Sequence, residues 1–212
     1  MSHGAQQLER LKAFSDAVFA IAITLLVIEV HVPRLDTPDD AAYLAALVHL
    51  MPSFMGFVLS FLAIGALWIA HHRLFGVLDG YEPRLMWPNM LLLMVIAFMP
   101  FATALMSSNP LARVPEVFYS ATLLAAGLLQ LFLFQLALRP GRVRAGVPPQ
   151  EVNALRWRAL ALPTAAAAAL LAAPHIPGNN NFFLLAIPLL ARAYAAIGRR
   201  RALRRMEPAL AD

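Results

Sequence analysis

Six long apolar stretches alternate with short polar segments along the chain. About 20 consecutive apolar residues cross the hydrocarbon core of a bilayer as an α-helix, whose backbone hydrogen bonds are satisfied within the helix itself. The pattern therefore predicts an all-α polytopic membrane protein, with one domain over residues 1–212 and short terminal tails. The six predicted transmembrane helices are Lys12–His31, Leu47–Ala70, Leu85–Met106, Val117–Leu138, Leu155–Ala173 and Phe182–Gly198.

Two features interrupt these stretches. The sixth has only ten uninterrupted apolar residues, Phe182 to Ala191, before Arg192, whose long side chain can reach the interface. Five prolines lie inside or near the stretches, and neighbouring helices in a bundle can satisfy the carbonyls that a proline frees, so we expect kinked helices. These prolines are Pro52, Pro88, Pro100, Pro163 and Pro188.

Composition indicates lipid surroundings. Hydrophobic residues make up 60% of the chain and charged residues 14%, whereas a soluble domain has about 45–50% and about 25%. There is no cysteine, which excludes disulfides, thiolate metal ligands and cysteine nucleophiles. The net charge of +5 does not indicate nucleic-acid binding, because the basic residues flank apolar blocks instead of alternating with aromatic and polar residues.

The basic residues are distributed unequally between alternate loops. One set of loops and tails holds fifteen of them, and the other set holds only Arg34 and Arg113. Because positive charge is concentrated on the cytoplasmic side of membrane proteins, we expect an even number of helices in the cell membrane and both termini in the cytoplasm. The run from Arg199 to Arg205 either contacts anionic membrane lipids or serves only to set this orientation.

The first predicted helix carries a narrow apolar stripe. At about 100° per residue, Ile21, Leu25 and Ile28 fall on one side of the helix, and Phe14 and Val18 continue that side toward the N-terminus. All five of these residues are apolar. The stripe therefore defines one face of the helix.

Ser15 and Asp16 place polar groups near the predicted cytoplasmic end of the same helix, and Asp16 lies about 140° from Ile21. A carboxylate inside a membrane is costly unless it is paired or faces water. Two interpretations stay open: Ser15 and Asp16 cap or fix the helix, or Asp16 carries protons. The candidate partners for fixing the helix are Arg10, His71, His72 and Arg73.

Two further polar residues follow. Thr24 lies about 60° from Ile21, and its hydroxyl either bonds back to the helix backbone or offers its oxygen to a passing ion. Glu29 lies near the outer end, where it either attracts cations to a mouth or is an ordinary interfacial charge.

The segment Trp68 to Phe75 contains two adjacent histidines. Neighbouring residues on a helix point about 100° apart, and no acidic residue follows at the spacing of a metal-binding motif. We therefore expect His71 and His72 to form hydrogen bonds to the first helix and not to bind a metal.

Three motifs taken together resemble the transmembrane-protein-175 family of potassium channels, and its bacterial members in particular. The first is R-x-x-x-F-S-D at Arg10, Phe14, Ser15 and Asp16. The second is AIAITLL at 20–26, and the third is W-x-x-H-H-R at 68–73, which includes Trp68, His71, His72 and Arg73. The six-helix layout extends this resemblance over most of the chain.

The resemblance implies a potassium-selective channel in which the first helices of a homotetramer surround the pore, without any cofactor. The tetramer is implied because the signature occurs once here, whereas animal members carry two repeats and form dimers. Ile21 matches the family's hydrophobic constriction, Leu25 and Ile28 form further rings, and Thr24 matches a pore-lining hydroxyl. The Thr-Val-Gly-Tyr-Gly loop of ordinary potassium channels is absent.

Two other classes of protein fit the sequence less well than a channel. An ion- or proton-coupled secondary transporter would use Asp16 or a histidine, but inverted repeats and interrupted helices meeting at mid-membrane are not evident. A membrane enzyme would need a convergent acid, base and nucleophile, and the serines stand in no recognisable motif. We therefore expect a channel and no catalysis.

Overall fold

The computed structural model describes residues 3–31, 39–176 and 180–206, and these residues are helical almost throughout. The order of elements along the chain is α1 (His3–Ile28), α2 (Asp40–His49), α3 (Met51–Gly76), the 3-10 turn η1 (Pro83–Leu85), α4 (Met86–Ser107), α5 (Arg113–Ala137), α6 (Pro149–Arg158), α7 (Ala161–Ala172), the 3-10 segment η2 (Asn180–Ala186) and α8 (Ile187–Met206).

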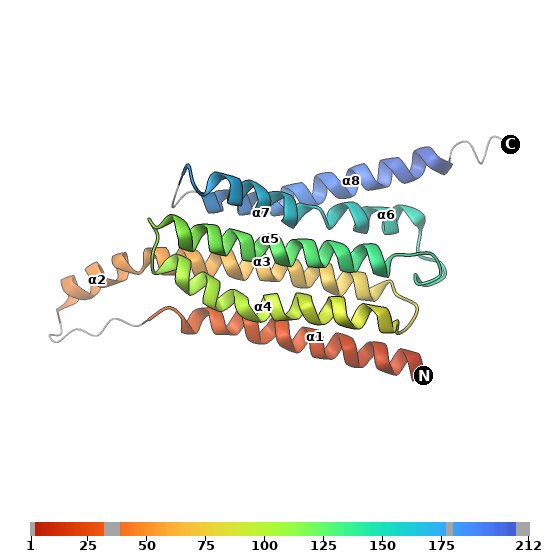
Figure 1. Ribbon diagram of the computed structural model, residues 1–212, viewed down its shortest axis with the longest axis horizontal. Coiled ribbons are helices and arrows are strands. Elements are labelled where there is room, and N and C mark those ends of the chain that lie inside the picture. The colour runs from red at the N-terminus through yellow and green to blue at the C-terminus, as the bar shows by residue number, and fades with distance from the viewer. Residues whose placement is uncertain (1–2, 32–38, 177–179, 207–212) are drawn as a thin grey trace.

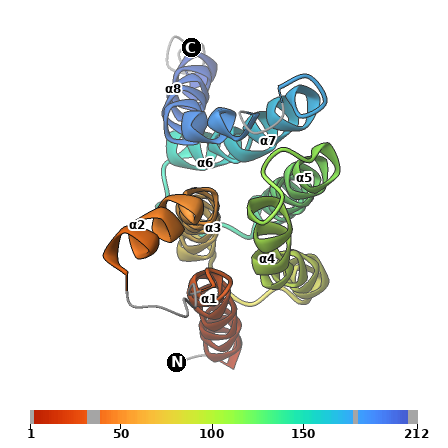
Figure 2. The same cartoon turned by 90° about the vertical axis from the view of Figure 1, so that its left-hand side faces the viewer.

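The long helices lie side by side along the length of the molecule, and the N-terminal end of α1 and the C-terminal end of α8 lie at the same end of it (Figure 1). Helix α4 packs against α1 and α5, α5 packs against α7, and α6 packs against α8. Viewed from the end, α1 lies at one edge of the bundle and the α6–α8 group at the opposite edge (Figure 2).

In the described part of the chain, five helical segments are long and apolar enough to cross a membrane. They are His3–Ile28, Met51–Gly76, Pro83–Ser107, Arg113–Ala137 and Phe182–Arg204. These agree with the first four predicted helices and the sixth, although α8 continues past Gly198 through a run of arginines.

The fifth predicted helix, Leu155–Ala173, is not continuous. Helix α6 ends at Arg158 and α7 begins at Ala161, so this predicted transmembrane helix is divided into two short helices, a larger interruption than the kink expected near Pro163. Pro163 supplies the reason, since it has no N–H to donate to the carbonyl four residues earlier and its ring clashes with that carbonyl. The two short helices nevertheless follow one another along the length of the bundle (Figure 1).

The N-terminal part of the second predicted helix also differs. Residues 47–49 belong to α2, an unpredicted helix whose cap is the side chain of Asp39 accepting a hydrogen bond from the Ala41 N–H at 3.2 Å. Pro52, in the first turn of α3, cannot donate a hydrogen bond back to α2, so the helix restarts at Met51.

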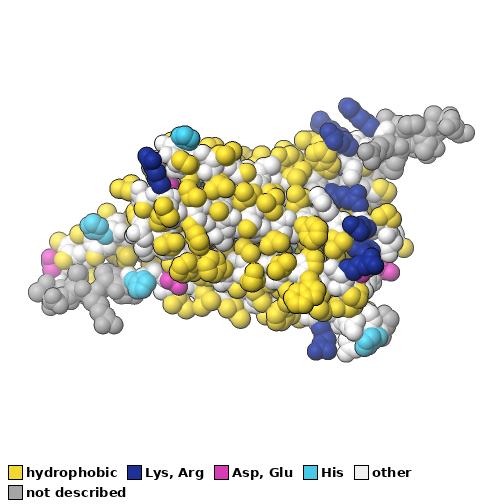
Figure 3. All heavy atoms as spheres, viewed as in Figure 1, with side chains coloured by type: hydrophobic (Ala, Val, Ile, Leu, Met, Phe, Trp, Pro, Cys, Tyr) yellow, Lys and Arg dark blue, Asp and Glu magenta, His cyan; other side chains and the backbone are white. Residues whose placement is uncertain are grey.

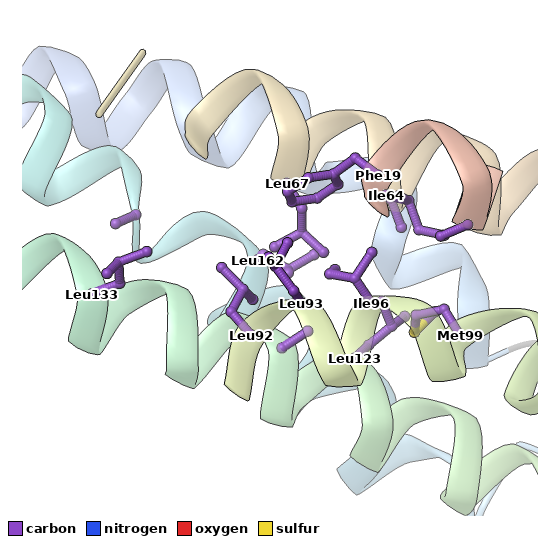
Figure 4. Packing of buried hydrophobic residues seen from close by; sticks show 14 of the residues in the cluster. Phe19, Ile64, Leu67, Leu92, Leu93, Ile96, Met99, Leu123, Leu133 and Leu162 are labelled. Atoms are coloured by element: carbon purple, nitrogen blue, oxygen red, sulfur yellow. The ribbon is translucent and has the colours of Figure 1, made fainter. Parts of the chain in front are cut away.

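The core fills the space between the long helices with interdigitated apolar side chains (Figure 4). Phe19 of α1 packs near Ile64 and Leu67 of α3, and α4 and α5 contribute Ile96 and Leu123. Between helices in lipid such contacts act through close van der Waals packing, because lipid tails are as apolar as the side chains. The core therefore fixes how α1 is rotated against α3 and α4.

The arginines are concentrated at one end of the bundle. On the face drawn in Figure 3, most Lys and Arg side chains lie at the end where α1 begins and α8 ends. We call this the basic end. It contains the N-terminal part of α1, the C-terminal parts of α3 and α8, and α6 (Figure 1).

Candidate functional site

The apolar stripe of α1 lies on the face that the rest of the chain leaves uncovered. Ile21 is 58% exposed, Ile28 68%, Phe14 52% and Leu25 39%, while Val18 is half-buried. The opposite face packs into the bundle, and its buried residues are Leu8, Leu11, Ser15, Phe19, Ala22 and Leu26. Helix α1 is thus apolar on both faces, and its outer face is free to contact lipid or another chain.

Thr24 belongs to this exposed face, and its hydroxyl bonds back to its own helix. The Oγ1 atom donates to the carbonyls of Ala20 at 3.0 Å and Ile21 at 2.9 Å. The structure thus contains the bond to the helix backbone, which is one of the two alternatives for Thr24. Since the hydroxyl acts as donor toward the backbone, its lone pairs remain available to a cation.

A buried chain of hydrogen bonds fixes the inner face of α1. Ser15 Oγ donates to the Leu11 carbonyl at 2.9 Å and accepts from Asn89 Nδ2 of α4 at 2.9 Å. The Asn89 Oδ1 atom lies 2.8 Å from Nε2 of His71 in α3, and because a carbonyl oxygen only accepts, that nitrogen is the donor. Ser15, His71 and Asn89 are all buried, so three helices are joined inside the core.

The ring of His71 is itself held between two aromatic side chains. It stacks on Phe75 with 4.5 Å between ring centroids and lies 5.4 Å from Phe19. His72, the next residue, is exposed and its ring lies 5.6 Å from that of Trp68. The predicted hydrogen bonds from these histidines to the first helix were wrong for His71, whose partner Asn89 lies on α4, and the two rings face apart. No group of three metal-ligating side chains converges within the described ranges.

Asp16 is fixed by an indole and not by the basic residues considered above. Trp68 Nε1 of α3 donates to Asp16 Oδ1 at 2.8 Å. The two ion pairs among the described residues are Lys12 with Glu9 and Arg142 with Glu82, so neither involves Asp16. Asp16 thus connects α1 to α3 beside the buried chain.

The remaining predicted residues lie at the periphery. Arg10 and Arg73 are exposed at the basic end. Glu29 is half-buried just beyond α1, and its carbonyl lies 2.9 Å from His31 Nδ1.

Sequence reasoning missed several buried polar groups. Asn89 is the most important, and the signal was present, since a polar side chain in an apolar stretch is costly unless it is paired. The same argument applies to a second cluster, in which Thr103 Oγ1 donates to Ser60 Oγ at 2.7 Å and Ser60 Oγ lies 2.9 Å from the Tyr119 hydroxyl. Further along α5, Gln130 donates to the Leu67 carbonyl at 2.8 Å. These contacts join α3, α4 and α5.

Replacing Trp68 with phenylalanine removes the indole N–H from Asp16 and leaves a ring beside His72. We expect the free energy of unfolding to fall by about 1 kcal/mol, because a hydrogen bond between helices is lost. Thermal unfolding of the purified protein in detergent measures this. The control is Trp87→Phe, at a side chain that is 76% exposed. An equal change in both variants would contradict a specific role for the indole–carboxylate bond.

Several known proteins are similar to this chain in sequence. The sequence profile of the family described as "Endosomal/lysosomal potassium channel TMEM175" matches residues 10–100. A potassium channel of Streptomyces collinus is 35% identical over 155 residues, which cover 70% of this chain and 74% of that protein. A potassium channel of Chamaesiphon minutus is 40% identical over 123 residues, which cover 57% of this chain and 61% of that protein.

A solved structure shows the same fold. The crystal structure of a lysosomal potassium-selective channel TMEM175 homolog from Chamaesiphon minutus superposes with a TM-score of 0.73 and 30% identity. The superposition covers 91% of this chain and 98% of that one. The fold is that of a helical membrane protein of the ion-channel class. The chain belongs to the TMEM175 family.

Proposed function

We propose that this chain is the subunit of a potassium-selective cation channel, four copies of which surround a pore lined by α1. The observation that carries the proposal is the uncovered apolar stripe of α1, in a chain whose bacterial relatives are named potassium channels. One α1 cannot enclose a pore, so the pore requires several copies. Animal members carry two repeats per chain and form dimers, which gives four repeats in the assembly. A chain with a single repeat would need four copies to give the same number.

In this tetramer the four Ile21 side chains form the narrowest ring, and Leu25 and Ile28 form wider rings beyond it. A ring of this kind excludes water unless it dilates, and so acts as a gate. It offers an ion no oxygen atoms in place of its hydration shell. Sodium is more strongly hydrated than potassium, so this constriction disfavours sodium. The Thr24 hydroxyl adds the nearest oxygen to the pore face.

The signature residues hold α1 in the rotation that this pore needs. Ser15 and Asp16 attach the inner face of α1 to α4 and α3, so the stripe faces away from the bundle. Phe14 and Arg10 remain exposed for contacts between copies.

In the cell membrane the basic end faces the cytoplasm, and both chain ends lie there. Glu29 then lies at the outer mouth, where its carboxylate attracts cations.

Ion flux into liposomes that contain the purified protein tests this function. Under a potassium gradient we expect fast potassium flux that needs no second gradient. Sodium and proton gradients are applied in parallel as controls, and we expect the sodium flux to be weaker. Slow flux that requires a second gradient would instead favour a coupled transporter, the alternative in which Asp16 binds the coupling ion. The Trp68–Asp16 bond does not favour that alternative, since it gives the carboxylate a structural partner.

A further inference from the structure

Three adjoining cavities follow the seam between α3 and the α6–α8 group. The first, about 370 Å³, is apolar and is lined by Leu59, Leu62 and Gly65 of α3 and by Leu185 and Pro188 across the seam. The second, about 170 Å³, continues it and shares Ala66, Ile69, Ile187 and Pro188. The third, about 450 Å³, shares Arg158 with the second and opens at the basic end. We call these three cavities together the α3–α8 groove.

The groove changes from apolar to basic along its length. Its basic end is lined by Arg73 of α3, Arg158 of α6 and Arg199 of α8, with Glu151 as the acidic residue among them. Arg158 is half-buried, and the charges of Arg73, Arg192 and Arg199 all act on it. Like charges held this close repel one another, so an anion between them would stabilise the arrangement.

The dimensions fit one leaflet of a membrane. From Leu59 to Gly76 the groove follows α3 for about 26 Å at the rise of an α-helix. One leaflet with its headgroup region is about 20 Å thick. The basic end of the groove would then lie at headgroup level and the apolar end at the level of the acyl chains.

We propose that the α3–α8 groove binds one anionic phospholipid, with its phosphate among Arg73, Arg158 and Arg199 and an acyl chain along the apolar part. Charge complementarity selects this occupant over a second copy of the chain. A second copy would have to supply carboxylates, and three of those at the basic end already have partners: Glu9 pairs with Lys12, Glu82 with Arg142, and Asp16 with Trp68. A phospholipid supplies both the anion and the apolar chain.

The test is native mass spectrometry of the purified protein in detergent, with phosphatidylglycerol, phosphatidylcholine or inorganic phosphate added separately. We expect one phosphatidylglycerol per chain, bound more tightly than phosphatidylcholine. Arg158→Gln should weaken it by roughly fivefold, and Arg158→Lys by less, because the charge is kept. The matched control is Arg84→Gln, an exposed arginine at the same end but outside the groove.

A second variant tests the apolar part. Gly65 lines the first cavity, and a Cβ added there would meet no atom within 4 Å, so Gly65→Phe fills the groove without displacing the backbone. It should reduce phosphatidylglycerol binding as much as Arg158→Gln does. Gly4→Phe, at an equally open position on α1, is the control.

Three outcomes would overturn the proposal. The first is equal binding of the two lipids, and the second is displacement of the lipid by inorganic phosphate at the same concentration, which would indicate a simple anion site. The third is a change in oligomer mass with Gly65→Phe while the lipid stays bound, which would indicate a contact between copies. None of these measurements depends on ion flux, so the result is independent of the proposed channel function.

Discussion

Replacing Ile21 with asparagine is expected to raise cation flux and to lower the potassium-to-sodium permeability ratio. Asparagine places an amide in the proposed constriction, so water enters the ring and sodium no longer has to lose its hydration shell. We expect the ratio to fall by a factor of roughly three or more. Liposome flux under separate potassium and sodium gradients measures both changes. The side chain is 58% exposed and lies outside the core, so the variant should fold normally.

The matched control for this variant is Val27→Asn. Val27 is 55% exposed on the same helix, but it lies about 120° from Ile21 around the helix axis. The control adds the same amide outside the stripe and should leave the permeability ratio close to that of the unchanged protein. If Ile21→Asn also left the ratio unchanged, the constriction would lie elsewhere, and the assignment of the stripe would fail.

The stripe and the first four transmembrane helices could be predicted because both depend only on the local sequence. A helix turns by about 100° per residue, so the spacing of Ile21, Leu25 and Ile28 determines their common face whatever surrounds it. Length and apolar content determine which segments cross a bilayer. Neither argument requires knowledge of a distant part of the chain.

The break between α6 and α7 shows the limit of this reasoning, since the sequence predicted a kink near Pro163 but not two separate helices. Composition alone favoured one helix over Leu155–Ala173, because alanine and leucine are strong helix formers. Pro163 interrupted it, and α5 accommodates the break at Gly127, where an added Cβ would lie 3.0 Å from the Pro163 nitrogen. A proline in a membrane helix permits either a kink or a restart, and the choice depends on the neighbouring helix.

The partners of the polar residues could not be predicted for a related reason. The sequence indicates that a carboxylate near the end of α1 needs a partner, and basic residues were the natural candidates. The partner is Trp68, which is 52 residues away and faces Asp16 only because α1 and α3 pack in this register. Asn89 likewise reaches Ser15 and His71 only once three helices are assembled.

Replacing Asn89 with leucine is expected to lower the free energy of unfolding by about 2 kcal/mol. Leucine has a similar volume, so packing is largely kept while two hydrogen bonds between helices are lost. The N–H of His71 is left buried without its acceptor. Thermal unfolding in detergent, followed by circular dichroism, measures the loss. In the flux assay, looser attachment of α1 should also reduce the discrimination between potassium and sodium.

Asn109→Leu is the control for this variant, because Asn109 is exposed and its amide donates to the Leu105 carbonyl of the adjoining helix α4, not to another helix of the described chain. It should change the free energy of unfolding by less than about 0.5 kcal/mol. Combining Asn89→Leu with Ser15→Ala then isolates the bond between α1 and α4. Coupled residues give an effect of the double variant that is smaller than the sum of the two single effects. Simple additivity would mean that the Ser15–Asn89 contact does not hold α1, and the rotation of the proposed pore face would then depend on apolar packing alone.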